Sequence, residues 1–228
     1  MPAPLILLPG MGADDRLFAP QREAFGEQLV VPKWIAPLEN DTIATYAQRL
    51  AEKVDPKQPC FVGGASFGGF VAMEMARHLQ TVAIFLIGSV RSSNELPPSL
   101  RALRPIRKLL VATPLETLAK AAATTARIST GNARGGVIAQ FAHADALFIR
   151  WACEAVLTWN QTPSDPVPRK VPVFQIHGAS DTILPARFTR PTKLVKGGGH
   201  VLSLTHSRQV NRFLRDHMDS LAAKREMA

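Results

Sequence analysis

Cysteine is scarce in this sequence, which has two among its 228 residues, Cys60 and Cys153. Two thiols cannot supply the disulfide framework of a small secreted domain, and these two do not have the spacing of metal ligands. We expect both to be reduced thiols that fill apolar surroundings. The sequence therefore predicts neither a disulfide scaffold nor a metal site.

Long apolar segments are also missing. The longest nearly apolar run, Val82–Val90, is about half as long as a membrane span. The opening MPAPLILLPG has no cationic region, and Pro9 ends a run of only four apolar residues, so it does not resemble a signal peptide. We therefore expect a cytoplasmic protein without a membrane span.

Acidic residues are outnumbered, since 18 Asp and Glu stand against 27 Lys and Arg, and the net charge is +9. Residues 91–170 hold 11 of the basic and 5 of the acidic residues, so two thirds of the net charge lies in this segment. A basic surface can bind nucleic acid, but no recognition helix, RNA-binding motif or interleaving of aromatic and basic residues accompanies it. We expect no nucleic-acid partner.

The length and the composition, 46% hydrophobic and 20% charged, indicate one globular domain. Short apolar runs, most of them without polar alternation, predict strands covered on both faces. The expected strands are Pro4–Leu8, Leu29–Ile35, Pro59–Gly63, Val82–Ile87, Val171–His177 and Thr192–Lys196. The expected helices among and after them are Leu17–Gly26, Thr42–Val54, Phe67–Leu79 and Ser207–Ala223. This alternation predicts an α/β fold, a parallel sheet of about six strands flanked by helices.

Residues 91–165 interrupt the alternation, because their patterns indicate helices only. The expected helices are Pro98–Ala112 (interrupted or restarted at Pro105), Pro114–Ile128 and Ala133–Trp159. We interpret this segment as a helical cap inserted between the fourth and fifth strands. Residues 1–90 and 166–228 would then form the α/β core.

The segment Gly64-Ala65-Ser66-Phe67-Gly68 matches G-x-S-x-G and lies between an expected strand and an expected helix. This is the setting of a nucleophile elbow, in which the serine has a strained backbone and its hydroxyl stands above the sheet. We expect the first and last positions to be glycine because strand and helix would otherwise collide there. A glycine-rich turn could instead cradle a phosphate, but the lysine of a P-loop and the spacing of a dinucleotide-binding motif are missing.

With this elbow in its context, the chain resembles the α/β-hydrolase superfamily, and within it the small carboxylesterases of the pimeloyl-carrier-protein methyl ester esterase type. The resemblance is weak in residues 91–145 and strong elsewhere. It implies a catalytic triad of serine, histidine and carboxylate that needs no metal or organic cofactor. Since the sequence begins at the first parallel strand, we expect the family's leading hairpin to be absent and the sheet to be all parallel.

Six histidines are candidates for the general base. They are His78, His143, His177, His200, His206 and His217. His200 follows three glycines after the last expected strand, in a loop that can turn back over the sheet edge, and the resemblance puts the base there. His143 in the cap is an outside candidate, and we expect His177 to pack or to support the site from behind. We expect His78 and His217 to point from helices toward the surface.

The resemblance assigns the carboxylate of the triad to Asp181, three residues after Gly178 and ahead of Pro185. A surface turn is the alternative, because Ser-Asp-Thr is also good turn chemistry. The order Ser66, Asp181, His200 along the chain is the order that this fold imposes.

The resemblance also implies two backbone N–H groups that bind the oxyanion of the tetrahedral intermediate. One is the amide of Phe67, directly after the nucleophile. We assign the other to Met11, because Pro9 has no donor and the glycines on either side of Met11 let the backbone bend. The family's commoner His-Gly opening is replaced here by Leu8-Pro9-Gly10, which changes the local hydrogen bonds.

Phe148 and Trp151, three residues apart on the last expected cap helix, are the best candidates for lining a substrate pocket. Plain packing onto the core is the alternative. The mostly apolar cap favours a medium acyl or alkyl group. We therefore expect a serine hydrolase that cleaves a carboxylic ester or thioester through an acyl-enzyme. Amidase, lyase or perhydrolase chemistry on the same triad, or a ligand sensor that retains it, are the alternatives.

Four basic residues, Arg101, Arg104, Arg107 and Lys108, lie close together in the expected cap. The esterases that the chain resembles take their acyl chain from an acidic acyl carrier protein, and a basic cap would suit docking of such a partner. A solvated helix face that keeps the protein soluble is the alternative.

Overall fold

One sheet of six parallel strands organises the protein, whose computed structural model describes residues 2–106, 145–160 and 171–226. The strand order is β2-β1-β3-β4-β5-β6, and every neighbouring pair is parallel. The strands are β1 (Leu5–Leu8), β2 (Leu29–Val30), β3 (Cys60–Ala65), β4 (Thr81–Ile87), β5 (Val173–Gly178) and β6 (Lys193–Val195). The predicted α/β fold with an all-parallel sheet is confirmed.

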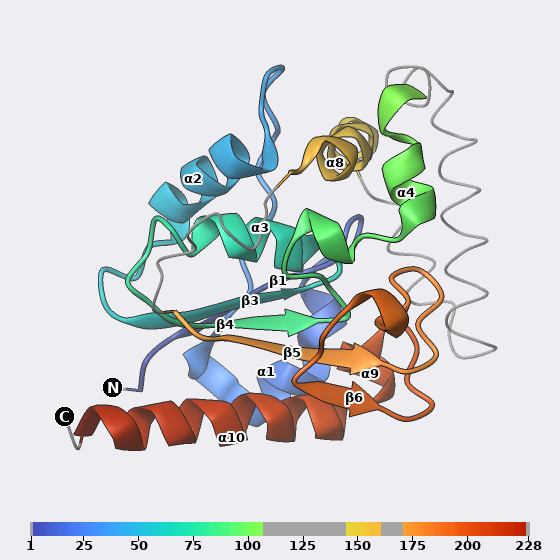
Figure 1. Cartoon of the computed structure of the whole chain (residues 1–228). Coiled ribbons are helices and arrows are strands. Elements are labelled where there is room, and N and C mark those ends of the chain that lie inside the picture. The colour runs from blue at the N-terminus through green and yellow to red at the C-terminus, as the bar shows by residue number, and fades with distance from the viewer. Residues whose placement is uncertain (1, 107–144, 161–170, 227–228) are drawn as a thin grey trace.

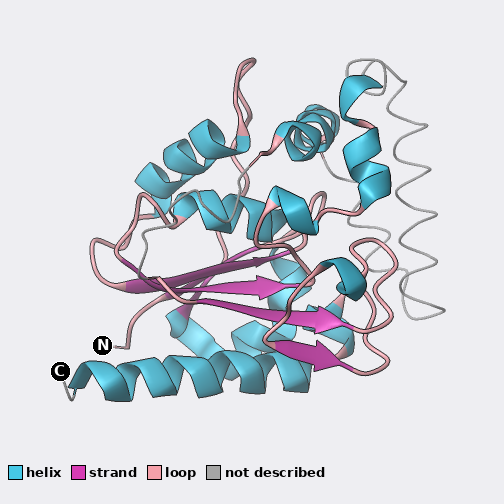
Figure 2. Cartoon of the chain, in the orientation of Figure 1, coloured by secondary structure: helices cyan, strands magenta, loops and turns pink. Residues whose placement is uncertain are grey.

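Helices cover both faces of the sheet (Figure 2). They are α1 (Ala19–Phe25), α2 (Ile43–Val54), α3 (Phe67–Met75), α4 (Pro98–Ala102), α8 (Ala146–Thr158), α9 (Leu202–Thr205) and α10 (Ser207–Glu226). Short 3-10 helices are η1 (Asp15–Phe18), η2 (Gly26–Gln28), η3 (Ser93–Glu95), η4 (Arg104–Ile106) and η5 (Ala186–Phe188). In Figure 1, α2 and α3 lie above the sheet with α8 and α4 beyond them, and α1 and α10 lie below it. Within the described ranges, no helix has the length and apolar character needed to span a membrane.

The two faces of the sheet contribute to two separate hydrophobic cores. In β1, Ile6 and Leu8 pack with α2, α3 and α8, whereas Leu5 and Leu7 pack on the opposite side with residues of α10. All four side chains are at most 1% exposed. Because each strand is covered on both faces, its sequence is continuously apolar rather than alternating.

The second strand is much shorter than the expected Leu29–Ile35. It ends at Val30, two residues before Pro32, which has no N–H for a strand ladder. Further along, the backbone N–H of Ile35 donates to the Tyr46 hydroxyl (3.0 Å), which in turn donates to the Ile35 carbonyl (2.9 Å). The Tyr46 side chain thus satisfies both backbone polar groups of Ile35.

The described part of the expected cap consists of two pieces. The expected helix Pro98–Ala112 ends at Ala102, and the 3-10 helix Arg104–Ile106 that follows contains Pro105. Pro105 has no N–H to donate to the Arg101 carbonyl, as a continued α-helix would require, which accounts for the break. The expected helix Pro114–Ile128 lies outside the described residues, and Ala133–Trp159 is described only from residue 145, where α8 follows.

The sheet topology creates a crevice at the carboxyl ends of β1 and β3. From β1 the chain connects to β2 on one side and later returns to β3 on the other side. The loops that leave β1 and β3 therefore run to opposite faces, and ligands of open parallel sheets bind at such a reversal of strand order.

Candidate active site

Ser66 lies at the sharp turn from β3 to α3, where its φ and ψ are 50° and −121°. Among described residues other than glycine, only Lys57 also has a positive φ. The two glycines of the motif are sterically required, as predicted. A Cβ on Gly64 would lie 2.3 Å from the carbonyl carbon of Gly68, and a Cβ on Gly68 would lie 2.1 Å from the Leu8 carbonyl oxygen. The close approach of strand and helix holds Ser66 in its strained conformation.

The structure brings Ser66, His200 and Asp181 together from three loops at the carboxyl end of the sheet. His200 Nε2 is 2.8 Å from Ser66 Oγ, and His200 Nδ1 is 2.8 Å from Asp181 Oδ2. The Asp181 side chain is fully buried, and that of His200 is 10% exposed. This is the linear arrangement that lets an imidazole accept a proton on one nitrogen while a carboxylate holds the other.

The glycine loop before His200 turns back over the end of β5, as expected from the sequence. Ser180 N–H donates to the Gly198 carbonyl (2.8 Å). A Cβ on Gly178 would lie 2.4 Å from the carbonyl oxygens of both Gly198 and Gly199. The glycine that follows His177 therefore lets the two loops pack closely, and this contact sets the position of His200 beside Asp181.

Asp181 is held as a carboxylate. Burial alone would raise its pKa, but hydrogen bonds from His177, His200 and the Leu184 amide outweigh burial and hold the pKa well below its usual range. The other oxygen, Oδ1, accepts the backbone N–H groups of Ile183 (2.9 Å) and Leu184 (3.0 Å). An ionised, immobile Asp181 fixes which nitrogen of His200 carries the proton.

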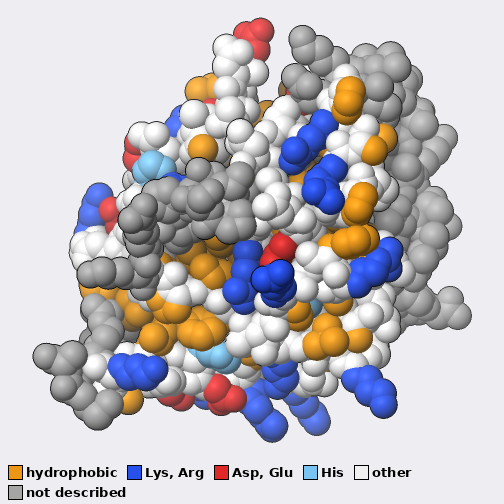
Figure 3. Space-filling view, viewed as in Figure 1, with side chains coloured by type: hydrophobic (Ala, Val, Ile, Leu, Met, Phe, Trp, Pro, Cys, Tyr) orange, Lys and Arg blue, Asp and Glu red, His pale blue; other side chains and the backbone are white. Residues whose placement is uncertain are grey.

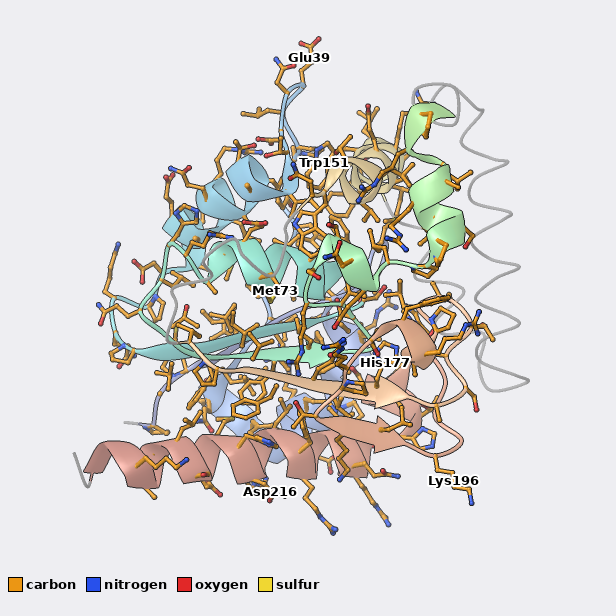
Figure 4. The ribbon with its side chains drawn as sticks, in the orientation of Figure 1. Glu39, Met73, Trp151, His177, Lys196 and Asp216 are labelled. Carbon is orange, nitrogen blue, oxygen red and sulfur yellow. The ribbon has the colours of Figure 1, made fainter. Side chains whose placement is uncertain are left out.

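His177, at the end of β5 (Figure 4), supports Asp181 from behind. Its side chain is fully buried, with Nε2 2.6 Å from the Leu184 carbonyl oxygen and 3.3 Å from Asp181 Oδ2. Both neighbours are acceptors, so Nε2 must carry a hydrogen. His177 thus contacts both the Asp181 carboxylate and the Leu184 carbonyl, which fits the supporting role expected from the sequence.

The remaining described histidines do not contact Ser66. His217, which was expected to point toward the surface, is partly exposed. Its ring lies 4.1 Å from the ring centroid of Phe174 and 4.5 Å from that of Phe213, and Nδ1 is 2.8 Å from the Phe213 carbonyl oxygen. Near the end of α9, the Nδ1 of His206 lies 3.0 Å from the Thr205 hydroxyl. His143 lies outside the described residues.

Met11 and Phe67, the residues expected to supply the oxyanion-binding amides, both line the same cavity as Ser66. Phe67 is the first residue of α3, whose first N–H groups have no partner within the helix. Met11 lies in a turn closed by a hydrogen bond from Ala13 N–H to the Gly10 carbonyl (3.0 Å), and Gly12 has a φ of 71°. A Cβ on Gly10 would lie 3.7 Å from Ser66 Cβ, so this turn packs directly against the elbow.

An apolar cavity of about 320 Å³ opens beside Ser66. Within the described residues, the lining consists of Met11, Ser66, Phe67, Phe70, Leu100, Leu103, Cys153, Val156, Leu157, Ile183 and Leu184. Apart from Ser66 and Cys153 these side chains are apolar, and burial raises the pKa of the Cys153 thiol, which keeps it protonated. The volume lies at the lower end of the range for small-molecule sites.

Phe148 and Trp151, the residues expected to line the pocket, are not among the described residues that line this cavity. Phe148 is 4% exposed, with its ring 5.2 Å from that of Trp34. Trp151 packs on Tyr46 (4.4 Å between ring centroids), and its indole N–H donates to the Asp41 carbonyl (2.8 Å). The face of α8 that carries these aromatic residues packs on the core, and another face carries the three residues that line the cavity.

The basic residues of the expected cap are only partly described. Arg104 donates to the Trp159 carbonyl (3.0 Å), so this side chain ties η4 to the end of α8, and Arg101 is exposed. Arg107 and Lys108 lie outside the described residues. On the face shown in Figure 3, basic side chains are spread over the described surface rather than gathered over α4.

Fold and site geometry together define a protein of the hydrolase class, and comparison with known families agrees. A model described as "Alpha/beta hydrolase family" matches residues 5–213, so the chain belongs to the α/β-hydrolase family. No protein with a curated description matches the sequence.

Solved structures show the same fold at low sequence identity. An esterase from Thermogutta terrifontis is 17% identical, with 96% of this chain and 90% of that chain covered and a TM-score of 0.73. MenH from S. aureus is 15% identical, with 96% and 94% covered and a TM-score of 0.73. The enol-lactonase from Burkholderia xenovorans LB400 is 18% identical, with 95% and 91% covered and a TM-score of 0.69. These proteins share the fold, which hosts several chemistries.

Proposed function

We propose that the protein hydrolyses carboxylic esters or thioesters, with Ser66 as nucleophile, His200 as general base and Asp181 as its partner carboxylate. The proposal rests on the hydrogen-bonded chain Ser66 Oγ–His200–Asp181, in which both distances are 2.8 Å. A serine hydroxyl becomes an effective nucleophile when a base within hydrogen-bond distance can accept its proton.

The reaction would proceed through an acyl-enzyme. Ser66 Oγ attacks the carbonyl carbon as its proton passes to His200 Nε2, and Asp181 stabilises the imidazolium. The amides of Met11 and Phe67 bind the oxyanion of the tetrahedral intermediate. Collapse expels the alcohol or thiol, which takes the proton from His200, and the acyl group stays on Ser66. Water activated by His200 then releases the acid and restores the serine.

The cavity supports an uncharged, apolar acyl or alkyl group as the part of the substrate that is buried next to Ser66. A carboxylate or ammonium group placed among Phe70, Leu103 and Val156 would lose its hydration without a charged partner in the described lining, which is costly. We therefore expect faster cleavage of p-nitrophenyl butyrate or hexanoate than of an ester whose acyl chain ends in a carboxylate.

The test of the function is turnover of p-nitrophenyl butyrate by the purified protein and by Ser66→Ala. We expect kcat to fall by about 10⁴–10⁶ in Ser66→Ala, as in triads that lack their nucleophile. A fluorophosphonate probe should label Ser66 and no other serine. Ser203→Ala is the matched control, because Ser203 is buried and its hydroxyl has no hydrogen-bond partner among the described residues.

Three outcomes would contradict the proposal. Labelling at another serine, or no labelling of folded protein, would remove Ser66 as nucleophile. Binding of the ester without turnover would favour a ligand sensor. A higher kcat/KM for matched amides than for esters would favour amidase chemistry on the same residues.

The form in which the ester is presented is a separate proposal. We propose an acidic acyl carrier as the donor, because the chain resembles carrier-dependent esterases and Arg101 is exposed on α4. Salt screens such docking, with a Debye length of about 8 Å at 0.15 M. We expect kcat/KM to fall with salt for a carrier-linked ester and not for a free ester. Parallel salt dependences, or no effect of Arg101→Glu, would leave Arg101 as ordinary surface charge.

A further inference from the structure

A short segment at the end of β4, Ile87–Ser89, contacts all three residues of the proposed triad. Ser66 N–H donates to the Ile87 carbonyl (3.1 Å), and the Ser89 hydroxyl donates to the Ser66 carbonyl (2.7 Å). Between these two bonds, Gly88 has a φ of 54°, and a Cβ there would lie 2.9 Å from the His200 carbonyl oxygen and 3.7 Å from Asp181 Oδ2. Both backbone polar groups of Ser66 are therefore held by the same segment that packs against its partners.

The surroundings of Ser89 are shaped around its hydroxyl. Ser89 is fully buried. A Cβ on Gly69 would lie 2.2 Å from Ser89 Oγ, so α3 can pass this point only because residue 69 is glycine. A side chain larger than that of glycine at this position would push the hydroxyl away from the Ser66 carbonyl.

A buried polar network holds the backbone of Ser89 from the other side. Gln175 in β5 is fully buried, and its side-chain amide donates to the Ser89 carbonyl (2.7 Å). Arg91 donates from Nε to the Gln175 side-chain oxygen (3.0 Å). Arg91 N–H donates to Glu95 (2.8 Å), and Gln175 lies 3.3 Å from the same carboxylate oxygen. Satisfied networks of this kind fix one conformation, here that of the loop carrying Ser89.

We propose that Ser89 is a positioning residue for the nucleophile, a role that rests on the proposed function. A serine with positive φ persists only where its surroundings hold it. The Ser66 carbonyl also accepts Gly69 N–H (2.9 Å), which closes the turn within the elbow. The hydrogen bond from the Ser89 hydroxyl holds this carbonyl from outside the elbow. Without it, Ser66 can relax and its Oγ moves away from His200 Nε2.

Ser89→Ala should lower kcat by about 10- to 100-fold and leave KM nearly unchanged. Displacement of a reacting group by about 1 Å can cost 10²-fold in rate. Ser89 is not part of the cavity lining, so substrate binding should not change. Ser203→Ala, which removes a buried hydroxyl with no hydrogen-bond partner in the described ranges, should alter kcat by less than about twofold.

The experiment compares kcat and KM for p-nitrophenyl butyrate in the wild type, Ser89→Ala, Gly69→Ala and Ser203→Ala, with rates normalised to active sites titrated by a fluorophosphonate. Gly69→Ala displaces the Ser89 hydroxyl without removing it. If Ser89→Ala does not fold, the kcat of Gly69→Ala decides whether Ser89 positions the nucleophile. We expect the rate constant for labelling of Ser66 to fall by the same factor as kcat in both variants.

Wild-type kcat in a folded Ser89→Ala or Gly69→Ala variant would overturn the positioning role. A raised KM with unchanged kcat would overturn it equally, because it would indicate a defect in binding. If the wild type neither cleaves the ester nor reacts with the probe, the proposed function itself fails. An active wild type with unaffected variants contradicts only the role of Ser89.

Discussion

Replacing Asp181 by asparagine would keep the size of the side chain but change the chemistry of its hydrogen bonds. If the amide nitrogen faces the two histidines, it donates to His200 Nδ1. The remaining proton of His200 then lies on Nε2, which cannot accept the Ser66 proton. If the amide oxygen faces the histidines instead, the NH₂ group meets the backbone N–H groups of Ile183 and Leu184, and donors face donors in a fully buried site.

Both orientations have a measurable cost. The wrong imidazole tautomer lowers kcat by about 10⁴ in comparable triads. Each buried donor left without an acceptor costs about 1–3 kcal/mol of the free energy of unfolding. In a domain of this size, each kcal/mol lowers Tm by about 2–4 °C. We therefore expect Asp181→Asn either to lose almost all turnover or to melt several degrees below the wild type, according to which way the amide faces.

The assays are p-nitrophenyl butyrate hydrolysis and thermal unfolding of the same preparations. Asp216→Asn makes the same chemical change at an exposed position of α10 (Figure 4) and should affect neither quantity. A loss of less than tenfold in kcat with a native Tm would refute the reasoning, because another carboxylate, or none, would then orient His200.

Three further expectations follow from the same contacts. Because the pKa of Asp181 is lowered in the folded state, the stabilisation by its carboxylate is present above the unfolded pKa of about 3.9 and is lost as pH falls toward the folded pKa. The free energy of unfolding, measured with denaturant, should therefore be lower at pH 3 than at pH 7, and this difference should be smaller in Asp181→Asn. Gly68→Ala should lower the free energy of unfolding by at least about 1–3 kcal/mol, since a Cβ at this position would lie 2.1 Å from the Leu8 carbonyl oxygen. A Tm equal to that of the wild type would contradict this expectation. Val156→Phe should fill part of the cavity and lower kcat/KM more for a hexanoate than for an acetate ester; equal effects would mean that the cavity does not hold the acyl chain.

The sheet was predictable because its strands are buried on both faces and read as continuous apolar runs. The early end of β2 was not predictable, because the backbone groups of Ile35 are satisfied by a side chain from α2 rather than by a neighbouring strand. Nothing in the sequence near Ile35 indicates that the Tyr46 hydroxyl binds both of its backbone groups. The ring contacts of His217 with Phe174 and Phe213 were not predictable for a similar reason, since they depend on how α10 packs against the sheet.

The convergence of Ser66, Asp181 and His200 was predictable from order and position. All three follow strand ends, and parallel strands bring their carboxyl ends to one edge of the sheet. The roles of Ser89 and Gln175 were not predicted. Gln175 did offer a signal, because it is a polar residue inside the apolar strand Val173–Gly178, and buried polar groups require partners.

The pocket residues could not be chosen from the sequence because α8 is apolar on more than one face. Phe148 and Trp151 were favoured for their size, yet size also favours burial in the core, where a large ring removes the most apolar surface from water. The polar atoms of the tryptophans support this placement. The Trp151 indole donates to the Asp41 carbonyl (2.8 Å), and that of Trp159 donates to the buried Glu74 carboxylate (2.9 Å).

These two hydrogen bonds join α8 to the loop before α2 and to α3, the helix that begins at the nucleophile. Cys153, between the two tryptophans, and Val156 therefore stand at a fixed distance from Ser66, although neither makes a directional contact with the elbow. The aromatic residues of α8 would then influence substrate choice indirectly, through the position of the helix. On this view, loss of the Trp159 indole should loosen the cavity wall before it disturbs the hydrogen bonds among Ser66, His200 and Asp181.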